Sequence, residues 1–212
     1  MKKIYLSPSN QTKNMYAYGN TNEAAQCRLI ANACEVALKR NGFQVKTNYL
    51  GSLSEKVEQS NSWGADLHVP IHTNASNGKV TGTRMFYYSE NDSSKTACKA
   101  IYDVLAPLTP GKSENIRAFP DLYEIRGTKA PAVYIEAEFH DNPEAAKWII
   151  EHVIEIGEAI AKGICNYYGV KYVASTVTYK VQIGAFAKYE NAEELLKKAK
   201  SAGFKSAYIA KA

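Results

Sequence analysis

Residues 66–75, DLHVPIHTNA, are the stretch from which the rest of the chain can be interpreted. They form a short, mostly apolar run between Gly64 and the polar sequence Ser76-Asn77-Gly78. A brief apolar run bounded by turn residues is typical of a buried strand in an α/β sheet. Ligands of open α/β sheets bind beyond the carboxyl ends of the strands. His72 lies at that end and is the first candidate for chemistry.

Strand and helix patterns alternate on both sides of this stretch. We expect further strands at residues 3–6, 43–48, 82–88 and 132–137, and helices at residues 21–41, 53–60, 93–105 and 144–168. The last range follows Asn142-Pro143 and is expected to hold two helices. Residues 114–129 are polar and irregular, which suggests a rim or substrate loop. Strands that alternate with helices predict an α/β fold: a mainly parallel, twisted sheet with helices on both faces.

A second, smaller unit follows residue 172. Residues 173–178, VASTVT, are a linker of small residues, and a strand at 179–186, a helix at 191–202 and a strand at 205–210 form a small C-terminal βαβ unit. We therefore divide the chain into residues 1–172, the linker and residues 179–212. Such a short unit cannot bury a core alone. It docks on the main domain, pairs with a copy of itself, or is half of a longer module.

The composition excludes several classes of protein. The chain is 45% hydrophobic and 22% charged, as in soluble globular proteins. No apolar run approaches the roughly 18 residues that a membrane span needs. The sequence after Met1 continues as KKIYLSPS, without the apolar region or the cleavage site of a secretory signal. We expect synthesis in the cytoplasm, so that action outside the cell would require release by another route.

The charge distribution indicates the class of binding partner, and the cysteine spacing indicates the state of the thiols. The net charge is +5, and residues 178–212 hold seven Lys and three Glu, hence +4 of it. Basic and aromatic residues are not interleaved there as on a nucleic-acid surface, so a polyanionic cell surface is the better partner. The four cysteines form no CxxC pair and are expected to be buried free thiols: Cys27, Cys34, Cys98 and Cys165.

Glu23 is the second candidate for chemistry. It starts the helix at 21–41 and shares its apolar stripe with Cys27, Ile30 and Cys34. Two interpretations stay open. A first-turn Glu interacts favourably with the helix dipole. Alternatively, a carboxylate that faces the sheet needs a charged partner, and a metal ion is one such partner.

His68 and Glu136 complete the list from the residues alone. In an extended strand His68 lies roughly 13 Å from His72, whereas ligands of one zinc ion lie about 2 Å from it. We therefore interpret His68 as structural. Glu136 closes the strand at 132–137 as His72 closes its own, so both side chains and Glu23 are expected at one pocket. The alternative for Glu136 is a buried ion pair with Arg126 or a lysine.

Three motifs together resemble a known family. TNE (21–23), IHTNA (71–75) and PAVYIEAEFHDN (131–142), in this order and spacing, resemble the zinc-dependent N-acetylmuramoyl-L-alanine amidases of the amidase-3 family over residues 3–168. The resemblance implies that Glu23 and His72 bind zinc and that Glu136 is catalytic. It also aligns Arg126 with an arginine of the family.

One departure concerns the first zinc ligand. The family has a His in a DPGHGG-type turn, where this chain has LSPSNQ and places Asn10. Asn is a poor zinc ligand. Either the metal is lost or another residue replaces the His. His140, four residues after Glu136, is our candidate; the alternative is a surface His beside Asp141. Asn10 or Gln11 could still assist through a water molecule.

The implied activity is hydrolysis of the amide bond between N-acetylmuramic acid and L-alanine in peptidoglycan, by an endolysin, an autolysin or a spore-lytic enzyme. Glu136 would take the proton of the attacking water, and Arg126, Asn74 or Asn10 would hold the substrate or the developing oxyanion. Two alternatives stay open: an inactive peptidoglycan-binding protein on an amidase scaffold, and a zinc peptidase that cuts the stem peptide.

The C-terminal unit has a resemblance of its own. VQIGAF (181–186), NAEELL (191–196) and GF (203–204) are similar to the first half of a sporulation-related repeat (SPOR) domain. This resemblance implies peptidoglycan binding. Because only one βαβ unit is present, we expect either a truncated module or a homodimer through this unit; a plain docking appendage is the alternative.

Overall fold

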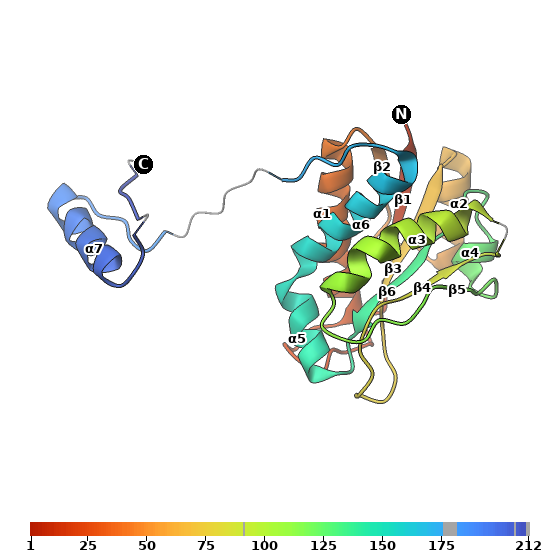
Figure 1. Ribbon diagram of the computed structural model, residues 1–212, viewed down its shortest axis with the longest axis horizontal. Helices are drawn as coiled ribbons and strands as arrows, with labels where there is room; N and C mark the ends of the chain where they lie inside the picture. Colours follow the sequence, from red (N-terminus) through yellow and green to blue (C-terminus); the bar gives the residue numbers. More distant parts are fainter. Residues whose placement is uncertain (91, 176–181, 206, 211–212) are drawn as a thin grey trace. The chain divides into compact units, whose positions relative to one another are not determined.

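The computed structural model describes residues 1–90, 92–175, 182–205 and 207–210 of the 212-residue chain. The chain divides into two compact units, Met1–Ser175 and Thr176–Ala212. Figure 1 labels their helices and strands. The division after Ser175 falls within the expected linker at 173–178, of which residues 176–178 lie outside the described part. The assignment of separate functional domains stays a prediction.

The first unit contains the whole sheet. Its strands are β1 (Lys3–Pro8), β2 (Gln44–Thr47), β3 (Leu67–Asn74), β4 (Arg84–Tyr87), β5 (Arg117–Ala118) and β6 (Tyr134–Phe139). Its helices are α1 (Glu23–Arg40), α2 (Leu53–Trp63), α3 (Ser93–Leu105), α4 (Tyr123–Arg126), α5 (Pro143–Glu151) and α6 (Val153–Tyr168), with a short 3₁₀ helix, η1 (Ala106–Leu108). β5 and α4 lie in the segment expected to be irregular, so that expectation was wrong in part.

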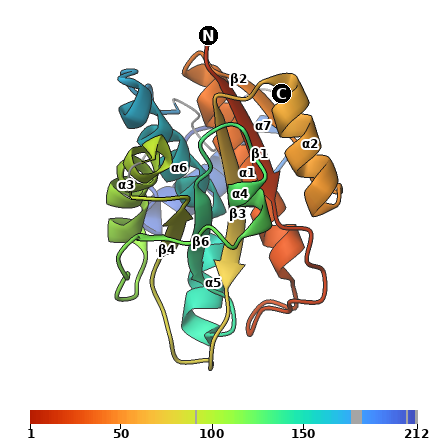
Figure 2. The same cartoon turned by 90° about the vertical axis from the view of Figure 1, so that its right-hand side faces the viewer.

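The strand order is β2-β1-β3-β6-β4-β5. β1, β2, β3 and β6 run parallel, β4 is antiparallel to β6, and β5 is parallel to β4. Helices α1, α3 and α6 cover one face of the sheet and α2 and α4 lie on the other (Figure 1). Figure 2 looks toward the face with α4, where β4, β6, β3 and β1 follow one another. The predicted α/β class is confirmed.

Local sequence signals account for the helix ends. The Asn22 side chain accepts a hydrogen bond from the Ala25 amide and so caps α1 immediately before Glu23. Ser52 caps α2, which ends at Gly64 in the left-handed conformation that glycine tolerates best. Asn142 caps α5, and a break at His152 separates α5 from α6, as predicted. The cap of α1 matters most, because it directs the first turn toward the sheet.

The core lies between the sheet and the layer of α1, α3 and α6. Buried Ile, Leu, Val, Ala and Cys side chains fill it. A Cβ atom on Gly157 of α6 would lie 2.7 Å from the carbonyl oxygen of Ile30, so only glycine allows α6 to approach α1 this closely. All four cysteines are buried and free, as expected. No described helix is long and apolar enough to cross a membrane.

β3 and β6 determine the geometry of the site. His72 of β3 lies opposite Glu136 of β6. Beyond this pair the register shifts, so that Asn74 lies opposite Phe139, and two steps along β3 match three along β6. One extra residue reverses the face taken by the side chains that follow it. Phe139 therefore shares a face with Glu136.

The second unit contains α7 (Tyr189–Ser201), which confirms the expected helix. The expected strand at 179–186 begins outside the described residues, and its described part, 182–186, is not a strand. The same holds for 207–210 within the expected strand at 205–210, where residue 206 lies outside the described part. The βαβ expectation is therefore wrong where it can be examined. Strands need neighbours to pair with, and Ile183, Phe186 and Phe204 are exposed.

Candidate functional site

Glu23 and His72 meet at the carboxyl end of the sheet. Glu23 is buried in the first turn of α1, and its Oε1 lies 2.8 Å from His72 Nδ1. Asn14 Nδ2 donates to Glu23 Oε2 at 2.6 Å. Burial opposes ionisation of Glu23, but the hydrogen bonds and charge contributed by His72, Asn14 and Ser9 outweigh it and lower the pKa of the carboxyl group. Glu23 therefore faces the sheet and has a polar partner there.

The ring of His72 is held from two sides. It stacks on Tyr134, with ring centroids 4.6 Å apart and planes 19° from parallel. Its Nδ1 faces Glu23, and Gln11 Nε2 lies 3.5 Å from the same atom. Sequence reasoning missed Tyr134, although its place two residues before Glu136 on the same strand puts both side chains on one face. The imidazole is thus fixed in orientation before any ligand binds.

Glu136 lies beside this pair on the neighbouring strand β6. It is the register partner of His72, and its Oε2 is buried with no partner in the part of the chain that the structure describes. Burial raises the pKa of Glu136 to about 7. The nearby charge of Glu23 also raises this pKa, whereas His72 and Arg84 lower it. No ion pair with Arg126 or a lysine is found for it in the described ranges. A carboxyl group of such a pKa can both take and return a proton near neutrality.

The turn after β1 presents Gln11, and not Asn10, to the site. Asn10 is exposed, and its Nδ2 donates to the carbonyl oxygen of Gly51 at 3.0 Å. Gln11 accepts a hydrogen bond from Asn14, which also binds Glu23. The alternative of assistance by Gln11 therefore has geometric support.

His140 is buried rather than at the surface, so the alternative of a surface His is wrong. Its Nδ1 lies 3.0 Å from both the hydroxyl and the carbonyl oxygen of Thr73, and its ring stacks on Tyr16 with centroids 5.1 Å apart. Donation from Nδ1 to the carbonyl leaves Nε2 as the nitrogen with a free lone pair. Among the described residues, no group of three or more His, Cys, Asp or Glu side chains could hold a metal ion. His140 is thus not grouped with Glu23 and His72.

Of the remaining expected site residues, Asn74 ends β3 and its Oδ1 accepts from the Ala75 amide. Arg126 ends α4, is exposed, and donates from Nη1 to the carbonyl oxygen of Asp121 at 2.6 Å. Sequence reasoning missed Arg84. This residue of β4 lies directly opposite Glu136 of β6. The signal for it was its position in the strand expected at 82–88.

His68 has a structural role, as expected. It is fully buried, stacks on Tyr5, and its Nε2 lies 3.1 Å from Glu124 Oε1. The Ser7 hydroxyl donates to the same carboxylate oxygen. The interaction joins α4 to β1 and β3 below the site. The imidazole of His68 therefore interacts with Glu124 and not with the site residues Glu23 and His72.

The donor set fits a zinc ion in part. A carboxylate and an imidazole nitrogen are both zinc ligands, and Glu23 Oε1 and His72 Nδ1 lie next to each other at a hydrogen-bond distance of 2.8 Å. Glu136 Oε2 adds a buried atom that lacks a partner within the described ranges. Among the described residues, however, no three His, Cys, Asp or Glu side chains are arranged so that they could hold one metal ion. Two ligands are therefore in position, and the third is open.

Comparison with known proteins matches both units. Residues 6–166 match the family model described as N-acetylmuramoyl-L-alanine amidase, and residues 175–212 match the SPOR domain. The sporulation-specific N-acetylmuramoyl-L-alanine amidase of Bacillus subtilis is 25% identical over 220 residues, covering 100% of this chain and 86% of the relative. The amidase CwlM of Bacillus licheniformis is 26% identical over 218 residues, covering 99% and 85%.

Solved structures agree with these matches. The catalytic domain of the amidase CwlV from Bacillus (Paenibacillus) polymyxa superposes with a TM-score of 0.73 at 25% identity, over 81% of this chain and 100% of that one. The catalytic domain of the CD27L endolysin, which targets Clostridia difficile, gives a TM-score of 0.68 at 25% identity, over 78% and 98%. Amidases of this family generally depend on zinc.

Proposed function

The chain belongs to the N-acetylmuramoyl-L-alanine amidase family, and we propose that it hydrolyses the amide bond between N-acetylmuramic acid and L-alanine in peptidoglycan. The observation that carries this proposal is Glu136, a buried carboxyl group of raised pKa beside the Glu23–His72 pair. Amide hydrolysis needs a group that removes a proton from water and delivers it to the leaving nitrogen. Glu136 is suited to both steps.

Glu23 and His72 are the proposed metal-holding residues. When bound, zinc would supply a Lewis acid that polarises the lactyl carbonyl and lowers the pKa of water. Tyr134 keeps the His72 ring in the orientation that this role requires. His140 stays a proposed third ligand through Nε2, which would require its side chain to approach the pair. Gln11 Nε2 lies 3.5 Å from His72 Nδ1.

The chain's own residues would handle the proton and the substrate. Glu136 Oε2 would accept the proton of the attacking water and pass it to the amine of L-alanine. Arg126, Asn74 and Asn10 are the proposed substrate residues. Of these, Asn74 lies at the end of the strand that carries His72.

The second unit is proposed to hold the enzyme on the cell wall. Its match to the SPOR domain and its excess of lysines support binding to peptidoglycan, which is a polyanionic surface in many cell walls. The exposed apolar side chains of this unit would suit pairing between two copies, Ile183 and Phe204 among them. Light scattering of the purified chain tests that homodimer, and a mass of one chain would exclude it.

Product analysis on purified peptidoglycan tests the activity. We expect new N-terminal alanine with every peptide bond of the stem intact, and loss of that product when a chelator is added. New amino groups from other residues of the stem would identify a peptidase instead. The comparison therefore separates the amidase from the zinc peptidase considered above.

The inactive wall-binding protein is a second candidate. It is favoured by the open third ligand position, since Asn10 faces Gly51 rather than His72. Zinc content after purification separates the two functions. We expect about one tightly held zinc ion per chain; a metal-free chain that binds peptidoglycan without releasing alanine would favour the inactive protein.

A further inference from the structure

We propose that Arg84 binds a carboxylate of the peptide stem next to the scissile bond, and that Glu114 occupies its guanidinium group when substrate is absent. The proposal rests on the proposed amidase function. It assigns a substrate contact to a residue outside the motifs that suggested the family. The contact would determine which chemical form of the stem peptide the enzyme prefers.

The first observation is the register of β4 and β6. Arg84 lies directly opposite Glu136 in this antiparallel pair. Side chains of directly opposite residues lie on the same face of a sheet, about 5 Å apart at Cβ. The guanidinium group therefore lies on the face that carries the proposed catalytic carboxyl. The effect of Arg84 on the pKa of Glu136 agrees with this proximity.

The second observation is the support beneath the guanidinium group. Arg84 Cζ lies 4.9 Å from the centroid of the Phe139 ring. The register shift in β6 turns Phe139 to the face of Glu136, as described above. Because Phe139 follows Glu136 along β6, the Arg84 side chain extends toward the carboxyl end of that strand. Ligands of α/β sheets bind at this end, and the flat ring holds the guanidinium group there.

The third observation is the state of its hydrogen-bond donors. Arg84 Nη2 donates to Glu114, while its Nε is buried and has no partner among the residues described. The side chains of Arg84 and Glu114 are 29% and 57% exposed. Ion pairs at such exposed positions contribute little to stability. A substrate carboxylate can therefore replace Glu114 at the exposed end of the guanidinium group at little cost.

The chemistry of the substrate supplies a matching group. The residue that follows L-alanine in a stem peptide carries a carboxylate, which some bacteria convert to a carboxamide. An extended peptide advances about 3.5 Å per residue, so this group lies within about 7 Å of the scissile amide. An arginine opposite the catalytic carboxyl is within reach of it. The planar fork of arginine binds carboxylates by two hydrogen bonds, which a carboxamide cannot match.

The experiment compares two soluble muropeptides that differ only in this group, carboxylate or carboxamide, with the full chain and three variants. We expect the wild-type chain to show a KM about tenfold lower for the carboxylate form. Arg84→Gln should remove that preference by raising KM for the carboxylate form alone. Glu114→Gln should lower KM for the same form. Arg28→Gln is the matched control, because Arg28 also lies over an aromatic ring, that of Tyr49, but on α1.

Several outcomes would overturn the proposal. One is an Arg84→Gln variant with unchanged KM and an equal loss of kcat on both peptides, since Arg84 would then act only through Glu136. Equal KM values of the wild-type chain for both peptides would overturn it as well. Arg84→Lys, which keeps the charge and loses the fork, serves if Arg84→Gln does not fold, and should lose most of the preference.

Failure of the amidase function itself gives a different result. In that case neither peptide is hydrolysed, and calorimetric binding of both peptides to the wild-type chain replaces the kinetics. Tighter binding of the carboxylate form, lost in the Arg84 variant, would still support the proposal. Equal binding of both forms would reject it.

Discussion

At the scale of single residues, Glu136 combines two properties that oppose each other. Its burial favours catalysis, because it brings the pKa to about 7. The same burial makes the ionised form costly in the folded protein, since Oε2 has no partner within the described ranges. Such an unfavourably buried group is common in active sites, where activity is gained at the expense of stability.

Glu136→Gln should therefore stabilise the metal-free protein in a pH-dependent way. The folded pKa, about 7, exceeds the ordinary value of 4.5, so the contribution of Glu136 to stability is complete below pH 4.5 and is lost as the pH rises through 7. Gln resembles the protonated form. In chelator-treated samples we expect equal Tm values near pH 4.5 and a higher Tm of the variant at pH 8.

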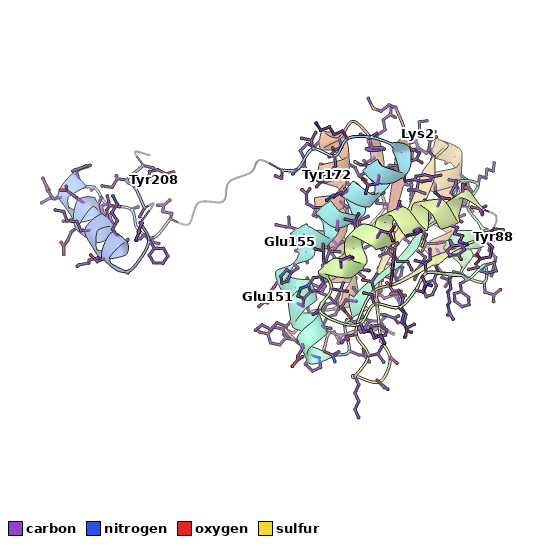
Figure 3. The ribbon with its side chains drawn as sticks, viewed as in Figure 1. Lys2, Tyr88, Glu151, Glu155, Tyr172 and Tyr208 are labelled. Atoms are coloured by element: carbon purple, nitrogen blue, oxygen red, sulfur yellow. The ribbon has the colours of Figure 1, made fainter. Side chains whose placement is uncertain are left out.

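The matched control for that measurement is Glu151→Gln. Glu151 is exposed at the end of α5. Figure 3 labels it beside α5 and α6. This variant should show no gain that increases with pH. A constant Tm difference for Glu136→Gln across the pH range would contradict the assigned cause.

The candidate site shows what single residues could and could not reveal in advance. The proximity of Glu23, His72 and Glu136 could be predicted, because helix starts and strand ends meet at the carboxyl edge of a parallel sheet, whereas their roles rest on the family resemblance and stay proposals. Arg84 was not predicted, since its role depends on an antiparallel pairing between β4 and β6 that the motifs do not encode. His140 was expected near the pair, but the register shift in β6 takes it to Thr73.

At the scale of elements, α4 is held on the sheet by a buried polar network. Glu124 of α4 contacts His68 of β3 and Ser7 of β1. Burial opposes ionisation of Glu124, but these partners outweigh it and lower its pKa. α4 was not expected, because four residues carry too little periodicity to indicate a helix. The buried His68 was the better indication that an element covers this part of the sheet.

Glu124→Gln should destabilise the protein at neutral pH by roughly 1.5–3 kcal/mol, the usual cost of losing buried hydrogen bonds to a charged group. Because the folded pKa of Glu124 is lowered, its contribution is present above pH 4.5 and is lost as the pH falls below that value. Denaturant unfolding at several pH values measures the difference. The exposed Glu58→Gln on α2 is the control. A difference that persists unchanged at pH 3 would argue against an ionised Glu124.

At the scale of the whole molecule, the two units differ in the secondary structure and buried core that stabilise them. The first unit holds the sheet and the main core. In the described part of the second unit, α7 is accompanied by exposed apolar side chains rather than by strands. The sheet and its helices could be predicted from local patterns. The tail could not, because a strand forms only when another strand pairs with it.

A chain that ends at Ser175 should keep its fold and its activity on soluble muropeptides. It should bind insoluble peptidoglycan more weakly, because it lacks the lysine-rich unit that matches the SPOR domain. Co-sedimentation with purified peptidoglycan at low and high salt measures this, and the full chain should lose more binding on salt addition. Equal sedimentation of both chains would place wall binding in the first unit.

The most direct test of the central claim separates metal binding from proton transfer at the site. Glu136→Ala and His72→Ala are compared with the wild-type chain for zinc content and for release of N-terminal alanine from peptidoglycan. We predict that Glu136→Ala retains zinc and loses the activity, by about 10²-fold or more, whereas His72→Ala loses both. Continued release of alanine by Glu136→Ala at the wild-type rate would contradict the role of Glu136.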